Sequence, residues 1–268
     1  MQPVFSASAT LFVLLLGYGL GFAQENVTVV APTSEAAEGL DLRAVGELFK
    51  DSENLEAFER ALNSSGLGVN NLDLDGDGNV DFIRVVEEVA DDAHLVVLQV
   101  PLGDDEFQDV ATIEVEKAAD DVPSMQVRGN EVIYGVHFYV VAPVHIHTWP
   151  IITWMYGPYY HPYRSVFYFG HYPRWWRPYR PVTLNVYRTR TVRLTTRNTF
   201  TVTRTSRINT VSRVQYQPSS SSLVKKRTSV KAKKMGGAEK KGKGGKKTKI
   251  KKGDNKKNPR KGKVHKRN

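Results

Sequence analysis

Apolar residues in the first half of the chain change from a helical spacing to an alternating one. Between Asp41 and Asn63 they recur at intervals of three and four, which is the spacing of one helix face. Asp51 or Ser52 can cap a second helix, so the pattern predicts two short helices that end at Asn63-Ser64-Ser65-Gly66. The two apolar faces consist of Leu42, Val45, Leu48 and Phe49, followed by Leu55, Phe58 and Leu62.

Beyond residue 81 the spacing becomes that of β-strands. Runs of β-branched and apolar residues are separated by short acidic or polar turns, which is typical of an antiparallel meander. The sequence therefore predicts an α+β fold, in which short N-terminal helices pack on a small antiparallel β-meander. The expected strands are residues 82–86, 95–100, 111–116, 124–128 and 132–141.

The segment before this acidic α+β domain (residues 41–141) differs in composition. Thr10 to Ala23 is apolar and uncharged, and it is shorter than the roughly 20 residues of a membrane span. It fits the apolar region of a signal peptide (residues 1–23) that is cut after Ala23, with an uncleaved anchor as the alternative. We expect residues 24–40 to form a flexible lead.

Three segments of different composition follow the domain. Residues 142–181 are rich in Tyr, Trp, Pro and His, and their prolines exclude a long helix or a central strand. Residues 182–218 are rich in Thr and Arg, and alternation such as Thr201-Val202-Thr203-Arg204 predicts extended structure. Residues 219–268 contain Ser and then mainly Lys and Gly. This segment cannot bury enough apolar surface to offset its ordering entropy, so we expect a disordered basic tail.

Charge is divided unevenly along the chain, although the net formal charge is only +10. Residues 1–140 contain 26 Asp/Glu and 6 Lys/Arg, whereas residues 224–268 contain 21 Lys/Arg and two acidic residues. A basic segment such as Lys225–Arg267 binds polyanions by releasing their counterions. The expected partners are a membrane surface, lipopolysaccharide or acidic polysaccharide outside a cell, and nucleic acid inside one. Intramolecular contact between the tail and the acidic domain is a further alternative.

The segment from Asp73 to Asp81, with the sequence DLDGDGNVD, concentrates carboxylates at alternate positions around two glycines. Calcium takes six to eight oxygen ligands, mostly carboxylates and carbonyls, so this pattern predicts a Ca²⁺ site. Gly78 occupies the sixth position of an EF-hand loop, but the twelfth is Arg84 instead of a bidentate glutamate. A strand pattern follows where an EF-hand continues as a helix. The alternative is an Asp/Gly turn without metal.

This segment resembles the D-x-D-x-D-G-x-x-D calcium loops that lead into strands, as in the FG-GAP repeats of β-propellers. The resemblance implies side-chain ligation by Asp73, Asp75, Asp77 and Asp81, and a backbone carbonyl ligand from Asn79. Because the motif is short and occurs once, it implies no propeller. More broadly, residues 72–134 resemble uncharacterised secreted bacterial proteins, a likeness that implies no activity.

Catalytic motifs are missing from the sequence. There is no cysteine, and therefore no disulfide, thiolate zinc site or cysteine nucleophile. No G-x-S-x-G, H-E-x-x-H or phosphate-binding glycine loop occurs either. We therefore predict an exported, non-enzymatic calcium-binding structural or binding module, which is secreted, periplasmic or associated with the cell envelope through its basic tail. An intracellular nucleic-acid-binding protein with a histone-like tail is the alternative, and a hydrolase is a third hypothesis.

Overall fold

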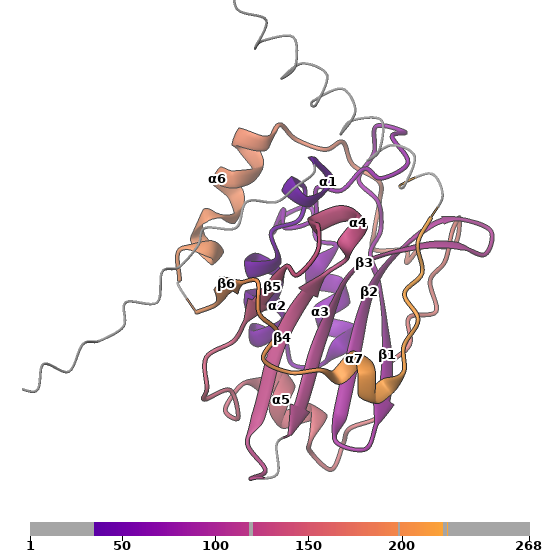
Figure 1. Cartoon of the computed structure of the whole chain (residues 1–268). Helices are drawn as coiled ribbons and strands as arrows, with labels where there is room; N and C mark the ends of the chain where they lie inside the picture. The colour runs from indigo at the N-terminus through magenta and orange to yellow at the C-terminus, as the bar shows by residue number, and fades with distance from the viewer. Residues whose placement is uncertain (1–34, 118–119, 198, 222–223, 225–268) are drawn as a thin grey trace, which may run out of the picture.

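The computed structural model describes residues 35–117, 120–197, 199–221 and 224. Within these residues it confirms the α+β fold class, with a six-stranded antiparallel sheet in the order β1-β2-β3-β4-β5-β6 (Figure 1). The strands are β1 Arg84–Ala90, β2 Ala93–Gly103, β3 Glu106–Lys117, β4 Pro123–Gly129, β5 Tyr139–Val141 and β6 Thr201–Thr203. The helices are α1 Glu35–Glu38, α2 Leu42–Asp51, α3 Leu55–Leu62, α4 Glu131–Tyr134, α5 Pro150–Met155, α6 Leu184–Thr195 and α7 Thr210–Val214. The expected signal peptide and the segment Lys225–Arg267 lie outside the described residues.

Helices α2 and α3 are the two short helices that the sequence predicts before the sheet, and the single turn α1 precedes them. The Asp41 carboxylate caps α2 by accepting the N–H of Arg43 at 2.9 Å. The cap of α3 is Asn54, which accepts the N–H of Ala57 at 2.8 Å. The expectation of Asp51 or Ser52 at this position was wrong, because α2 itself extends through Asp51 and ends at Ser52.

The sheet is covered on both faces. Val85, Val96 and Leu98 belong to the main core together with the apolar residues of α2 and α3. Val86, Leu95 and Val97 alternate with them and form a smaller cluster with Val214 and Tyr216. In Figure 1 the helices α2 and α3 accordingly lie behind the sheet, and α7 lies in front of it. Because both faces are covered, β2 is buried along almost its whole length and does not alternate between core and solvent.

The expected strand over residues 132–141 is interrupted. Asn130 accepts the N–H of Val132 at 3.0 Å and starts the single turn α4, which ends at Gly135 with a φ of 79°. Only Tyr139–Val141 continues as strand β5. The asparagine cap and the following glycine together favour a turn over the strand that the apolar residues predicted.

The Thr/Arg-rich segment forms helix α6 where extended structure was expected. Threonine and valine favour strands locally, because their branched side chains lose freedom in a helix. However, Tyr187, Thr191 and Leu194 recur at helical spacing and are all buried against the domain. Tertiary packing therefore overrides local propensity here. The extended structure predicted at Thr201–Thr203 is confirmed as strand β6, which pairs with β5.

Residues outside the expected domain also contribute to its core. Ala37 and Leu40, which were expected in a flexible lead, are buried in and beside α1. Ile146, Trp149 and Ile151 pack in the same core as the sheet. At the other end, the N–H of Asp109 donates to the carbonyl of Ser219 at 3.0 Å, and the N–H of Ser219 donates to the Asp109 carboxylate at 2.8 Å. The N–H of Ser221 donates to the side chain of Gln108, so residues 219–221 lie along β3. None of the helices in the described part of the chain has the length and the apolar composition that a membrane span requires.

Candidate metal centre

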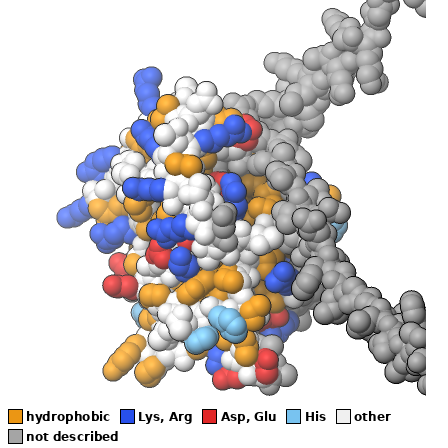
Figure 2. All heavy atoms as spheres, turned by 90° about the vertical axis from the view of Figure 1, so that its left-hand side faces the viewer, with side chains coloured by type: hydrophobic (Ala, Val, Ile, Leu, Met, Phe, Trp, Pro, Cys, Tyr) orange, Lys and Arg blue, Asp and Glu red, His pale blue; other side chains and the backbone are white. Residues whose placement is uncertain are grey.

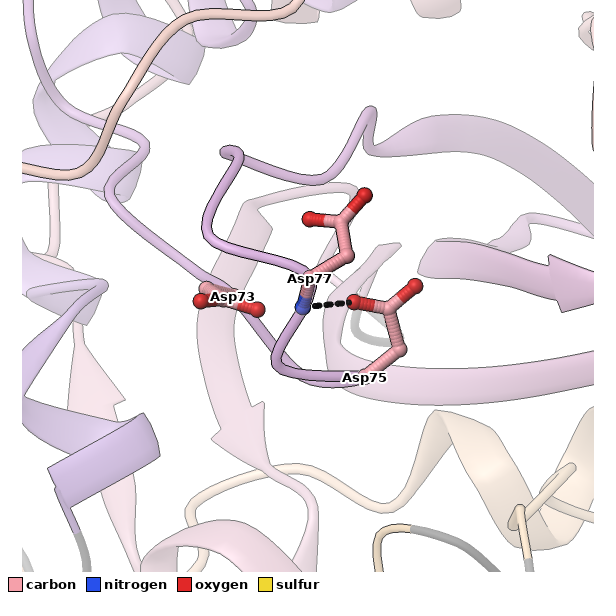
Figure 3. A group of neighbouring side chains, drawn as sticks. All are labelled: Asp73, Asp75 and Asp77. Carbon is pink, nitrogen blue, oxygen red and sulfur yellow. Dashed lines mark hydrogen bonds between the residues drawn. The ribbon is translucent and has the colours of Figure 1, made fainter.

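Three of the predicted ligands lie together. Asp73, Asp75 and Asp77 each place one carboxylate oxygen within 4.8 Å of the others. Figure 3 shows the three side chains around a single bend of the chain. Among the described residues they are the one group of three or more acidic or histidine side chains that are close enough to share a metal ion.

Hydrogen bonds between side chains and backbone fix the bend. Asp73 accepts the N–H groups of Gly76 at 2.6 Å and Gly78 at 3.2 Å. Asp75 accepts the N–H of Asp77 at 3.0 Å, which is the dashed line in Figure 3. These are Asx-type turns, in which a short carboxylate replaces a backbone carbonyl. The same residues therefore both shape the loop and supply its negative oxygens.

Gly76 and Gly78 are required by the backbone of this bend. Their φ angles are 81° and 84°, in the left-handed region that side chains with a Cβ atom disfavour. An ideal Cβ atom on Gly78 would meet nothing within 4 Å, so the constraint at this position is conformational and not steric contact. The two glycines thus allow the chain to turn around the position that a cation would occupy.

The other two predicted ligands are placed differently. Asn79 donates both its backbone N–H (2.7 Å) and its side-chain amide (3.1 Å) to the Asp77 carboxylate. Asp81 lies outside the group of three and accepts the N–H of Leu74 at 2.6 Å. Burial raises the pKa of Asp81 to about 8; the Leu74 N–H lowers it, and the neighbouring carboxylates of the loop raise it further.

The base of the loop is anchored in the domain. The N–H of Asp81 donates to the carbonyl of Leu72 at 2.8 Å, and the N–H of Val80 donates to the carbonyl of Tyr179 at 2.7 Å. Asn71 forms two hydrogen bonds with the backbone of Val182, at 2.8 and 3.0 Å. The C-terminal half of the chain therefore holds both ends of the loop.

An aromatic cluster surrounds the residue that follows the loop. Phe82 is buried, and its ring lies 5.3 Å from that of Trp176 and 5.7 Å from that of Phe167, both edge to face. Tyr172 and Trp175 complete the cluster at 5.8 and 6.2 Å. Sequence reasoning did not connect this proline-rich segment with the acidic loop, because the two are about 90 residues apart and share no period.

Among the described residues, no basic side chain forms an ion pair with the carboxylates of the loop, Asp73, Asp75 and Asp77 included. Arg84, which stands where an EF-hand has its bidentate glutamate, is directed elsewhere. Its guanidinium lies 5.2 Å from the ring of Phe107 and donates to the carbonyl of Ser165. Within the described part of the chain, a divalent cation could therefore bind these carboxylates without displacing an ion-pair partner.

Comparison with known proteins does not assign the chain to a family. The chain matches no protein-family model, no curated protein and no solved structure. Function must therefore be argued from the site.

A second group of polar residues was not found from the sequence. Glu56, Glu59, Arg60 and Tyr163 line a cavity of about 230 Å³ together with Trp175. Glu59 is buried and accepts the N–H of Val85 at 2.7 Å. Burial raises the pKa of Glu59 to about 7, although the hydrogen bonds from Val85, Ser165 and Tyr163 lower it. Glu59 lies on the side of α3 that faces the core. An acidic residue at a core-facing helical position is the sequence feature that could have pointed to this group.

Proposed function

We propose that this protein is an exported, non-enzymatic calcium-binding module, whose ion stabilises the segment between α3 and β1. The observation that carries the proposal is the close approach of the Asp73, Asp75 and Asp77 carboxylates. An all-oxygen site on a bend suits Ca²⁺, which accepts irregular coordination, better than Mg²⁺, which demands a near-ideal octahedron. Asp81 and the carbonyl of Asn79 would complete the ligand set.

A structural role for the ion fits the position of the loop. The loop joins the last N-terminal helix to the first strand, and its base is hydrogen-bonded to Tyr179 and Leu72. Without a cation, three clustered carboxylates repel one another and oppose this compact bend. A bound ion would replace this repulsion with attraction. The ion would thereby stabilise the folded chain by mass action.

Attachment to an anionic envelope is the second part of the proposal. The segment Lys225–Arg267 carries most of the positive charge of the chain, and basic segments of this kind bind anionic lipid or polysaccharide surfaces. The folded part adds further basic groups. Figure 2 shows Lys and Arg side chains gathered over the upper part of the face that carries α6, where Arg188, Arg190 and Arg193 are exposed.

Calorimetric titration of the full chain with CaCl₂ tests the metal site. We expect saturable binding to the native protein and its loss in Asp75→Asn/Asp77→Asn, because both substitutions remove a charged ligand. Asp104→Asn/Asp105→Asn is the matched control, since it makes the same change of charge at the turn between β2 and β3. Asp105 has a φ of 55°, a conformation that asparagine tolerates. Absence of heat with the native chain, or equal loss in both variants, would refute the site.

Export is tested by the N-terminus of the mature protein. If residues 1–23 form a signal peptide, mass spectrometry of the protein from its native source should find a chain that begins at Gln24. A chain that retains Met1 and copurifies with nucleic acid would instead favour the intracellular alternative.

A further inference from the structure

An exposed aromatic hairpin (residues 165–172) extends from the edge of the sheet. Before it, the chain runs beside β1: the carbonyl of Tyr163 accepts the N–H of Glu87, and the N–H of Ser165 donates to the carbonyl of Val85, both at 2.9 Å. Tyr168 and His171 then exchange backbone hydrogen bonds of 3.2 and 2.9 Å around a two-residue turn. These contacts hold the hairpin in a defined conformation.

The hairpin has two unlike sides. Phe167 and Tyr172 pack against Phe82, with ring centroids at 5.7 and 5.8 Å. The remaining apolar side chains face solvent: Val166 is 72% exposed, Tyr168 53% and Phe169 43%. Apolar side chains gathered on a folded surface in this way mark a contact site for a protein or a membrane. Packing on Phe82 stabilises one side of the hairpin. It does not account for the exposed apolar residues on the other side.

Positive charge accompanies these apolar groups. Arg174, Arg177 and Arg180 are exposed in the segment that follows the hairpin, and Trp175 between them is 39% exposed. Among the described residues none of these three arginines forms an ion pair, whereas Arg164 pairs with Glu88. No acidic residue occurs between residues 141 and 223, so the acidic groups near the hairpin are those of the neighbouring loop, whose carboxylates act on Tyr172. The partner of this surface is therefore expected to be both apolar and anionic.

We propose that the aromatic hairpin inserts its tip into the surface of an anionic lipid bilayer. Val166 and Phe169 would enter the boundary between headgroups and acyl chains, and Tyr168 would remain at headgroup level, where amphipathic rings are favoured. The arginines would contact lipid phosphates, as basic side chains near an anionic leaflet do. This inference extends the proposed attachment to the envelope, because it adds a folded contact to the basic tail.

A lipid surface fits the hairpin better than a polysaccharide does. Sugar-binding surfaces combine aromatic rings with side chains that hydrogen-bond to hydroxyl groups. The hairpin has one such polar pair, the stacked rings of Tyr168 and His171, whereas Val166 and Phe169 have no polar group and an added Cβ atom on Gly170 would meet nothing within 4 Å. A short, open and apolar tip can enter a bilayer without displacing other parts of the fold.

Site-specific fluorescence on the full chain tests the proposal. Because the protein has no cysteine, Phe169→Cys provides a single position for an environment-sensitive dye. Val122→Cys at the turn before β4 is the matched control, since Val122 is similarly exposed at 36% and follows the acidic residues Asp120 and Asp121. Each labelled chain is mixed with vesicles of phosphatidylglycerol and phosphatidylcholine, or of phosphatidylcholine alone. We expect a blue shift and higher intensity at position 169, only with the anionic vesicles, and no change at position 122.

Unlabelled Phe169→Ser and cosedimentation with the same vesicles complete the test. At a salt concentration that screens the tail, we expect Phe169→Ser to weaken binding about tenfold, because a buried phenyl group is lost from the bilayer. If the native chain cosediments but the dye at position 169 remains in water, the hairpin proposal fails and attachment by the tail survives. Equal dye responses at both positions, or no binding to any vesicle, would also refute the hairpin proposal. The Asp75→Asn/Asp77→Asn background removes two negative charges close to the hairpin, so it should keep the dye response at position 169 or increase it, and failure of the calcium site is detected separately.

Discussion

The side-chain amide of Asn63 forms two hydrogen bonds with the backbone of Ile83. It accepts the N–H of Ile83 at 2.8 Å and donates to its carbonyl at 2.7 Å, while also donating to the carbonyl of Glu59 at 2.9 Å. Asn63 ends α3, and Ile83 precedes β1 by one residue. This one buried side chain therefore closes the 20-residue loop that contains the acidic bend.

Asn63→Ala should strongly destabilise the fold. The substitution leaves a buried N–H and a buried carbonyl of Ile83 without partners, which costs about 3 kcal/mol in the free energy of unfolding. Urea denaturation measures the loss. Asn185→Ala on the exposed side of α6 is the control and should change stability by less than about 0.5 kcal/mol. Equal stabilities of the two variants would contradict the role given to Asn63.

Tyr187→Phe tests the attachment of α6. The Tyr187 hydroxyl donates to the carbonyl of Val69 at 2.9 Å and accepts the N–H of Asp41, the cap residue of α2, at 2.7 Å. Phenylalanine preserves the ring but leaves both backbone groups unpaired, so we expect a loss of about 2 kcal/mol. Tyr159→Phe serves as control, because Tyr159 is 88% exposed. A thermal midpoint unchanged in both variants would show that α6 is not held by this hydroxyl.

Stability should fall as the pH rises through neutrality, partly because of Glu59. Its pKa is raised by burial to about 7, above its ordinary value of 4.5, so the folded chain binds the proton more tightly than the unfolded chain does. The contribution is complete below about pH 4.5 and is lost as the pH passes 7, with an amplitude of at most about 3 kcal/mol.

Glu59→Gln isolates this contribution. Glutamine cannot ionise, yet its oxygen can still accept the N–H of Val85. The difference in unfolding free energy between the native chain and Glu59→Gln should therefore change between pH 4.5 and 8, in favour of the variant at high pH. Urea denaturation across this range measures the difference. If the two curves remain parallel, Glu59 does not titrate in the folded protein.

Calcium should raise the thermal midpoint more effectively than magnesium. A ligand present at 100 times its dissociation constant stabilises the folded state by about 2.7 kcal/mol, which corresponds to roughly 5–10 °C for a chain of this size. Magnesium should need higher concentrations, because it loses its water ligands reluctantly. Asp73→Ala should abolish the effect of both ions and also loosen the bend, since Asp73 accepts two backbone N–H groups. Equal shifts with both ions would argue against a calcium-selective loop.

The sequence predicts those parts of the fold whose periodicity is local. The apolar spacing of Leu42–Leu62 and the alternation around Ile113 are sufficient to place α2, α3 and most of the sheet. The DLDGDGNVD run likewise identifies the three carboxylates that come together, because turn chemistry acts over a few residues. Binding of calcium by these three carboxylates, with Asp81 and Asn79 as further ligands, remains a prediction.

Features that depend on distant packing could not be predicted. Helix α6 consists of residues with low helix propensity, and it forms because Tyr187 and Leu194 find buried positions against the N-terminal helices. The cluster around Phe82 likewise joins residues about 90 positions apart. The same holds for Glu59, whose raised pKa depends on burial that only the folded chain supplies.

The covering of the sheet by residues from both ends of the chain has a consequence for biosynthesis. Strand β6 and the residues around Tyr216 are made after about 200 amino acids have been joined, yet they complete one edge and one face of the sheet. A nascent chain that has emerged only as far as β4 lacks these partners, so one edge and one face of its sheet are uncovered. We therefore expect the chain to complete its fold only late in translation.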